Sequence, residues 1–493
     1  MSAGCCAPAL TIQAAQPPLV DGKGQCCQTD ESNGSIDFAE ALGWTPEAPK
    51  ELSRQRLRRR RMIAAKVLRG KSPRVTSESG PIAAREQKRG RWYPVSACGT
   101  VPHQGGMSFE VRGSGRVDAL GIMRCGSVWT CPECAQRVAT HRAIEISTVI
   151  DRARAAGHRV EMVTFTLPHS LDLTADECMG RLKEALRRFS SDGSGARALK
   201  KIGFLGQVRS IEVTYGHSSG WHFHAHAVLV FDPDPNATEA DAKADFARSL
   251  ELKKALYPVW KRAAHAAGSD TPSFRHGLDV RVVWSATDYI AKMPEAAKVK
   301  ADAGKGRWGA EAELSKAYMK EGRKSSRTPW ELLDSAVDNP ADAKLFEDYA
   351  RATWGRTQME WSKGTRDLRK LFLDGAEDKA DEQLVHEEPE WVFEDEAGED
   401  DTGQDNVVVE RVQISSPDAW RARRENFGSL DRAVLAVERG DALSLARALE
   451  DEGWTLTRTS VGGMSKAIRE DRNGREREMF ALDPAVWAAT WGR

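Results

Sequence analysis

Long hydrophobic runs are missing from this 493-residue chain. No stretch approaches the roughly 18 apolar residues that a membrane-spanning helix needs, which argues against a protein held in a bilayer. The opening residues, MSAGCCAPAL, also lack the basic stretch and apolar core of a secretion signal. We therefore expect a cytoplasmic protein with no membrane partner.

Net charge is also missing, because 72 basic and 72 acidic residues give a formal charge of +0. This balance would argue against a nucleic-acid partner, but the charges are segregated along the chain. A basic helical stretch covers residues 51–90, whereas the segment EEPEWVFEDEAGEDD has no basic residue. We predict that the basic stretch contacts DNA phosphates, with a solvated charged helix as the alternative. The residues predicted to do so are Arg58, Arg59, Arg60 and Arg61.

Cysteines are few and odd in number, nine in all, which in a reducing compartment favours metal binding over disulfides. Four of them cluster along the chain and end in the tight knuckle Cys-Pro-Glu-Cys. Four thiolates in tetrahedral geometry are typical of structural zinc. The predicted zinc ligands are Cys98, Cys125, Cys131 and Cys134. The long gap after Cys98 leaves His103 and His141 as alternative ligands.

Between residues 90 and 375, short β-branched runs alternate with amphipathic stretches, which predicts an α/β or α+β fold. A five-residue turn joins two of the strands, so at least that part of the sheet is antiparallel. Strands are expected at 160–167, 206–215, 221–231 and 278–284. Helices are expected at 135–156, 175–190, 239–266 and 285–293, and after the acidic segment at 418–439 and 442–452.

The strand 221–231 carries His222, His224 and His226, which alternation places on one face of the sheet. If Tyr215 faces Trp221 across the turn, the carboxylate of Glu212 faces His224, with Cβ atoms about 5 Å apart. Two imidazoles and one carboxylate suit Mn²⁺ or Mg²⁺ with positions left open for a phosphate oxygen. His222 is the least certain of the predicted ligands, and contact with DNA is its alternative role.

The segment Ala-Thr-Asp-Tyr289-Ile-Ala-Lys292 follows the last predicted strand and opens a helix. Tyr289 and Lys292, three residues apart, share a helix face. A nearby ammonium favours the phenolate or neutralises an attacked phosphate, so this pair suits a tyrosine nucleophile. The pattern is weak alone and gains meaning from the histidine strand that precedes it.

These segments, in this order, resemble the rolling-circle replication initiators of Gram-positive, particularly actinobacterial, plasmids. The resemblance covers about residues 95–370. It rests on CGSVWTCPEC, TFTLPH, the His-hydrophobic-His strand, Tyr-Ile-Ala-Lys, the tail GRK and RTPWELL, and WSKG. It implies a His-hydrophobic-His (HUH) endonuclease core, in which a central antiparallel sheet is flanked by helices.

The resemblance also implies a mechanism. Tyr289 attacks the origin phosphate and stays attached to the new 5′ end, and a host polymerase, with a host helicase, extends the 3′ hydroxyl. Because position 293 is Met, the chain looks like the single-tyrosine class, in which a glutamate can activate water at termination. Glu313 lies in about that place, and Glu311 is the alternative.

Two other families share the metal chemistry. A conjugative relaxase usually has its tyrosine before the histidines, and the related transposases are typically shorter and lack the cysteine knuckle. A non-catalytic, zinc-dependent DNA-binding regulator is the alternative from another class. Such a regulator would shift DNA without cutting it.

Six parts are predicted along the chain. Residues 1–50 lack periodicity and are expected to be a disordered leader. The two helices and the hairpin around Asn473-Gly474 near the C-terminus favour a winged-helix-like fold. The remaining parts are a basic segment at 51–90, a zinc-binding region at 91–145, an HUH endonuclease domain at 146–375, an acidic linker at 376–410 and a small domain at 411–493.

Overall fold

The computed structural model describes ten ranges of the chain, all within the unit Pro46–Arg493. They are residues 53–71, 93–102, 106–191, 193–233, 242–283, 326–373, 379–386, 407–461, 465–470 and 476–481. The predicted leader therefore lies outside the described residues. No helix in these ranges is both long enough and apolar enough to cross a membrane.

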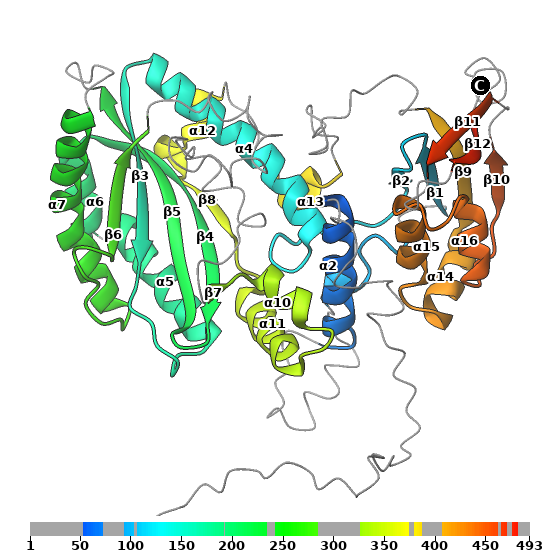
Figure 1. Cartoon of the computed structure of the whole chain (residues 1–493). Coiled ribbons are helices and arrows are strands. Elements are labelled where there is room, and N and C mark those ends of the chain that lie inside the picture. The colour runs from blue at the N-terminus through cyan, green and yellow to red at the C-terminus, as the bar shows by residue number, and fades with distance from the viewer. Residues whose placement is uncertain are drawn as a thin grey trace, which may run out of the picture. The chain divides into compact units, whose positions relative to one another are not determined.

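An antiparallel sheet of six strands forms the centre of the larger part of the fold (Figure 1). Its order is β6-β3-β5-β4-β7, and β8 also pairs with β4. The α+β class and the antiparallel sheet flanked by helices are thereby confirmed. The strands are β3 (His158–Thr166), β4 (Phe204–Gly216), β5 (Gly220–Pro233), β6 (Leu278–Val282), β7 (Ser326–Arg327) and β8 (Met359–Trp361).

Strands β4 and β5 form the predicted hairpin, and its register is the predicted one. Tyr215 pairs with Trp221, and Glu212 pairs with His224. The turn closes at Gly220, whose φ of 77° is accessible to glycine and whose added Cβ would lie 2.6 Å from the carbonyl oxygen of Ser170. The local turn therefore fixes which side chains face one another across the hairpin.

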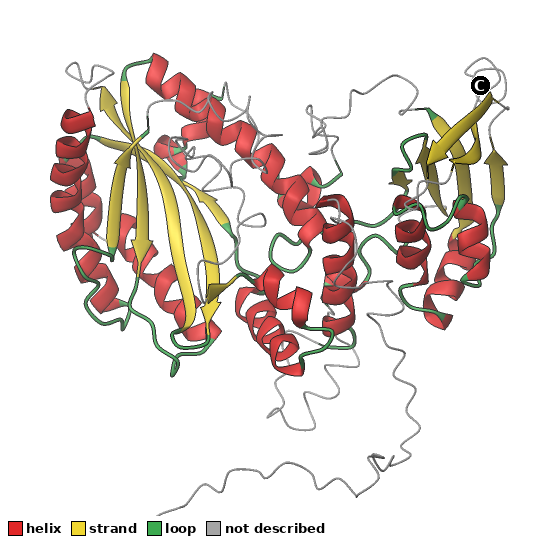
Figure 2. Cartoon of the chain, in the orientation of Figure 1, coloured by secondary structure: helices red, strands yellow, loops and turns green. Residues whose placement is uncertain are grey.

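Helices cover both faces of this sheet (Figure 2). On one face Phe165 packs against Phe189 and Trp260, so α5 and α7 lie there, with α6 beside them. On the other face Val228 and Val230 share a buried core with α4 and α12. These helices are α4 (Pro132–Ala155), α5 (Ala175–Ser191), α6 (Gly193–Lys201), α7 (Ala242–Ala266) and α12 (Leu368–Phe372).

Alternation along β5 determines where its histidines lie. His222, His224 and His226 share the parity of Val228 and Val230, so they continue the α4 face of the sheet toward the hairpin end. Apolar residues fill that face near α4, and the imidazoles replace them further along the strand. The sheet thus changes from core to polar site along a single strand.

A second sheet, of order β10-β9-β1-β2, joins segments from both ends of the described chain. Glu110 in β1 pairs with Arg411 in β9, and the core between this sheet and its helices includes Phe109, Val412 and Val434. The strands are β1 (Gly106–Arg112), β2 (Val117–Leu120), β9 (Val408–Ser415) and β10 (Arg458–Val461). The helices are α14 (Ser416–Glu425), α15 (Ser429–Glu438) and α16 (Leu445–Asp451).

This sheet changes the predicted domain boundaries. The hairpin β1–β2 was assigned to the zinc-binding region, but its strand partner is β9 of the expected small C-terminal domain. The single helix predicted at 418–439 is broken in two at Gly428, which has a φ of 88°. A strand, β9, also precedes the helices and pairs with β1, so the described part of residues 411–493 shares a sheet with the hairpin β1–β2. The expected terminal hairpin is present as β11 (Ser465–Glu470) and β12 (Glu476–Ala481).

Most of the remaining elements contact α2 or α4, and the 3₁₀ turn η4 contacts β4. Helix α2 contacts α4, α10, α11 and α15, and α13 contacts α4. They are α2 (Ser53–Leu68), α10 (Pro329–Ser335), α11 (Pro340–Thr353), α13 (Asp381–Leu384) and the 3₁₀ turns η1 (Pro94–Ser96) and η4 (Gly364–Arg366).

Candidate metal centres

Three of the predicted catalytic-metal ligands converge on the α4 face of the sheet. One carboxylate oxygen of Glu212 lies 3.2 Å from Nε2 of His224 and 3.3 Å from Nε2 of His226. Glu212 and His226 are buried, and His224 is partly exposed. The site therefore has a buried floor and one ligand that solvent can reach.

The donor atoms fit a divalent ion. Neighbouring ligands of an octahedral ion with bonds of 2.0–2.1 Å are about 3 Å apart, close to the two distances between Glu212 and the imidazoles. The Oγ1 atom of Thr164 lies 3.0 Å from Nδ1 of His226, which leaves Nε2 of that ring directed toward Glu212. Such a partner on the far nitrogen is what fixes the orientation of a metal-binding histidine.

His222 lies on the predicted face of the strand but is not among the three converging donors. Its ring stacks on His224 at a centroid distance of 4.9 Å and on His169 at 4.4 Å. Burial, followed by the neighbouring imidazoles, lowers the pKa of His222 to about 3. Its Nε2 atom is buried without a hydrogen-bond partner. His222 is thus a neutral ring in a stacked column beside the three converging donors.

The predicted nucleophile and its neighbours cannot be placed against this centre. Tyr289, Lys292 and Glu313 lie outside the described residues, as does the alternative Glu311. The described chain reaches Val283 after β6, six residues before Tyr289. The catalytic roles of these residues stay predictions.

Four buried cysteines form a second cluster, and they are those predicted to bind zinc. The Sγ atom of Cys98 lies 3.6 Å from that of Cys134 and 3.6 Å from that of Cys131, and the Sγ atoms of Cys125 and Cys134 are 3.7 Å apart. A tetrahedral zinc ion with Zn–S bonds of about 2.3 Å would give edges of about 3.8 Å. All four side chains are free thiols, so the spacing matches a metal site and not a disulfide.

The long gap after Cys98 has a structural explanation. The hairpin β1–β2 occupies most of it, and a bridge between Pro102 and Ile122 brings its two ends together. Cys98 and Cys125 therefore meet although 26 residues lie between them. His141 is not among the converging donors, and His103 lies outside the described residues.

Burial raises the pKa of Cys125 and Cys131 well above the usual thiol value. Four thiolates together at this depth require a cation, because burial penalises each negative charge. The four converging Sγ atoms therefore suit a metal ion that takes tetrahedral thiolate ligands.

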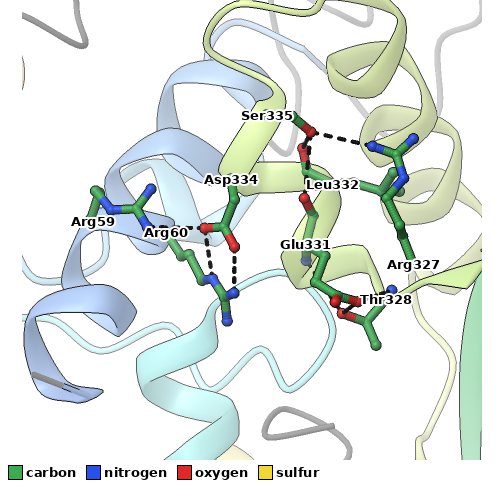
Figure 3. A network of polar contacts seen from close by, with 8 residues as sticks. All are labelled: Arg59, Arg60, Arg327, Thr328, Glu331, Leu332, Asp334 and Ser335. Atoms are coloured by element: carbon green, nitrogen blue, oxygen red, sulfur yellow. Dashed lines mark hydrogen bonds and ion pairs between the residues drawn. The ribbon is translucent and has the colours of Figure 1, made fainter. Parts of the chain in front are cut away.

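The four arginines predicted to contact DNA have partners inside the protein instead. Asp334 pairs with both Arg59 and Arg60 (Figure 3), and Arg58 pairs with Glu438 at 3.2 Å. The guanidinium group of Arg61 is 1% exposed. The structure therefore does not support the prediction for this run, because carboxylates of the same chain take the place that phosphates were expected to fill.

Arg61 joins three segments of the chain. It donates to the carbonyl oxygen of Cys98 at 2.6 Å, lies 3.0 Å from the carboxylate of Glu133 and pairs with Asp431 in α15. Burial would lower the pKa of Arg61, but Asp431 and Glu133 raise it well above the usual value. One buried charge thus links α2, the cysteine knuckle and the C-terminal helices.

The motif Arg-Thr-Pro-Trp-Glu has a structural role. Thr328 and Glu331 form a capping box at the start of α10, with Pro329 in its first turn. Arg327 pairs with the nearly buried Asp342 at 2.6 Å and, through β7, lies opposite Tyr215 of β4. The motif therefore attaches α10 and α11 to the hairpin that carries Glu212, His224 and His226.

Sequence reasoning missed two residues of the histidine site, Thr164 and His169. Both belong to the segment Thr-Phe-Thr-Leu-Pro-His at the end of β3. Its pairing with β5, which places Thr164 opposite His226, follows from tertiary structure and not from any local turn. Alternation within Thr-Phe-Thr was the one available signal that these hydroxyls share a face.

Comparison with known proteins finds relatives in Streptomyces. The chain is 29% identical over 320 residues to "Protein rep" of Streptomyces lividans, which covers 53% of this chain and 67% of that protein. It is 26% identical over 203 residues to "Neomycin resistance protein" of Streptomyces cyanogenus, covering 34% and 45% of the two chains. No protein-family model and no solved structure matches the chain. The relatives confirm the resemblance to replication proteins of actinobacteria.

Proposed function

We propose that this Rep-like chain initiates rolling-circle replication of a plasmid by nicking one strand of the origin. The observation that carries the proposal is the convergence of Glu212, His224 and His226 on one face of the sheet. The similarity to "Protein rep" supports the biological role. The strand-cutting chemistry rests on the donor set and on the sequence motifs.

The three ligands would hold Mn²⁺ or Mg²⁺, which when bound would polarise a phosphate oxygen. Glu212 supplies the negative charge of the site, and Thr164 holds the ring of His226 in its ligating orientation. His224, the most exposed of the three, faces the side from which DNA would enter. Cys98, Cys125, Cys131 and Cys134 would hold a structural zinc ion apart from the chemistry.

Tyr289 supplies the nucleophile in this proposal. Its phenolic oxygen loses its proton and attacks the phosphorus, a bond forms between them, and the bond to the 3′ oxygen breaks. Lys292 offsets charge on the phosphate, and the protein remains attached to the 5′ end through a phosphotyrosine. Glu313, or alternatively Glu311, would activate water at termination.

The proposed partners are origin DNA, as a single strand or cruciform, and a host polymerase and helicase that extend and unwind from the nick. A conjugative relaxase and an HUH transposase share the first chemical step. Their substrates differ, so transfer-origin or transposon-end DNA in place of a replication origin would be the preferred target of either.

The test is to incubate the full chain, a single-stranded origin oligonucleotide and Mn²⁺, and then to identify the modified peptide by mass spectrometry. Tyr289→Phe should bind the oligonucleotide normally yet neither nick it nor become attached, because only the attacking oxygen is lost. Tyr215→Phe is the matched control and should remain active. The ring centre of Tyr215 lies 5.0 Å from that of Trp221, and Tyr215 pairs with Arg327 of β7 across the sheet.

Three outcomes would contradict the proposal. They are DNA attached to a residue other than Tyr289, full cleavage in EDTA, and a free 5′ phosphate after the first turnover. DNA binding without any cleavage would favour the zinc-dependent regulator.

A further inference from the structure

Arginines and aromatic rings lie close together where the residue after α2 contacts the segment that follows α14. The guanidinium carbon of Arg69 lies 4.2 Å from the ring centre of Phe427, and that of Arg423 lies 5.8 Å from the ring centres of both Phe427 and Trp420. Trp420 is 44% exposed, and Arg69 and Arg424 are also exposed. We call these five residues the Phe427 surface.

The spacing of residues along α14 explains why three of these five residues lie together. Trp420, Arg423 and Arg424 are related by three and four residues in α14, so they share one face of that helix. Arg423 is held in place because it donates to the carbonyl oxygen of Ser96 at 2.6 Å. The cation is therefore positioned before any ligand arrives.

Arg69, Arg423 and Arg424 differ from the run Arg58 to Arg61 inside α2. Arg58 to Arg61 each pair with a carboxylate of the chain. Among the described residues, by contrast, no carboxylate forms an ion pair with Arg69, Arg423 or Arg424. Burial and the like charge of Arg69 both lower the pKa of Arg423. The protein thus holds positive charges together without neutralising them, and an anion would relieve their repulsion.

We propose that the Phe427 surface binds the phosphates of duplex DNA next to the strand that is cut. This inference rests on the proposed function and adds to it a binding surface separate from both metal centres, since neither cluster takes a ligand from α14 or from the end of α2. Guanidinium groups are the side chains best suited to phosphate oxygens.

Duplex DNA fits this surface better than a single strand does. Proteins that bind single strands offer open aromatic faces on which bases stack. Here the guanidinium group of Arg69 lies over the ring of Phe427 at 4.2 Å, so a base cannot take that place. The surface presents charge more than stacking area, as contacts to a duplex backbone require.

The test compares the full chain with the double variant R69Q/R424Q, which changes only the two exposed arginines. Binding to a short duplex of arbitrary sequence is measured in EDTA between about 50 and 200 mM salt, because phosphate contacts do not depend on sequence. We expect the slope of log K against log salt to fall by about 2, since each lost phosphate contact removes about 0.9. At the lowest salt, binding should weaken about tenfold or more.

Two matched variants separate charge at this surface from charge in general. Arg421→Gln removes an exposed arginine of the same helix that pairs with Asp418, and it should leave the slope nearly unchanged. R69K/R424K keeps the charge and should retain most of the binding. An unchanged slope in R69Q/R424Q, or an equal loss in Arg421→Gln, would overturn the inference.

Cleavage of a short single-stranded oligonucleotide with Mn²⁺ distinguishes this inference from the proposed function. R69Q/R424Q should cut that substrate as fast as the unmodified chain does. If the unmodified chain cuts nothing, the proposed function fails; if it cuts but the duplex slopes agree, only the Phe427 surface fails. A greater loss of single-strand binding than of duplex binding would show that the wrong form of DNA was assigned.

Discussion

If the cysteine cluster holds zinc, as proposed, removal of the ion should unfold more of the protein than the knuckle itself. We consider the substitution Cys131→Ser, which replaces one of the four ligands at the residue that caps α4. Glu133, in the first turn of that helix, pairs with Arg61, and Arg61 also bonds to the carbonyl oxygen of Cys98. Loss of the metal would therefore loosen contacts from α2 to α15.

The expected magnitude is large compared with the stability of a domain. Structural zinc contributes about 10–16 kcal/mol of apparent binding free energy in small zinc-dependent peptides, whereas whole domains are stable by about 5–15 kcal/mol. If Cys131→Ser loses only about 3 kcal/mol of this, Tm should still fall by roughly 6–12 °C for a unit of 150–250 residues. Complete loss of the metal should leave this part of the chain unfolded.

The assay combines metal analysis with thermal unfolding of the full chain. We expect about one zinc ion per chain in the unmodified protein and far less in Cys131→Ser. Cys178→Ala is the matched control, because Cys178 is also buried but lies in α5 outside the cluster. Burial raises the pKa of Cys178 to about 11, so it is a neutral thiol and should not affect the zinc content.

Two results would refute this reasoning. One is unmodified protein that contains no zinc and unfolds at the same temperature with and without a strong chelator. The other is Cys131→Ser with a full complement of zinc. An equal fall in Tm for Cys178→Ala without loss of metal would show that the assay reports cavity formation and not metal binding.

His226→Ala should abolish cleavage but leave DNA affinity almost unchanged, because affinity comes mainly from cations on phosphates; cleavage and gel-shift assays check this. His222→Phe should retain Mn²⁺ affinity, whereas His222→Ala should lose part of it, because the ring of His222 stacks on His224. Titration calorimetry measures both affinities, and an equal loss in the two variants would indicate that His222 is itself a ligand. Asp431→Asn should lower the free energy of unfolding by about 3–5 kcal/mol, because it leaves Arg61 buried beside only one carboxylate. Unfolding in urea measures this change, and a value below about 1 kcal/mol would contradict the prediction.

Local patterns in the sequence were enough to predict that Glu212 and His224 face each other. The five-residue turn fixes Tyr215 opposite Trp221, and alternation then brings Glu212 opposite His224 without knowledge of the rest of the sheet. Alternation along β5 could not show that His222 stacks on His169, because His169 follows a different strand, β3, which pairs with β5. The break at Gly428 had a local signal, since glycine is a common helix breaker.

The partners of the basic run Arg58 to Arg61 could not be predicted, for a different reason. A row of arginines on a helix has the same appearance whether it faces phosphates or carboxylates of its own chain. The partner of Arg60 is Asp334, 274 residues away, and that of Arg61 is Asp431, 370 residues away. Only the tertiary fold decides between these roles, and it leaves the less conspicuous Arg69 without a carboxylate partner among the described residues.

The pairing of β1 with β9 has a consequence for synthesis of the chain. Glu110 and Arg411 are partners across this pair although 301 residues separate them. At roughly 5–20 residues per second, β1 leaves the ribosome about 15–60 s before its neighbour exists. Throughout that interval the hairpin β1–β2 exposes an open edge and an apolar face, which invites pairing with other nascent chains. The six-stranded sheet has all of its strands by then, so Glu212, His224 and His226 can converge before the sheet that joins the two ends of the described chain has formed.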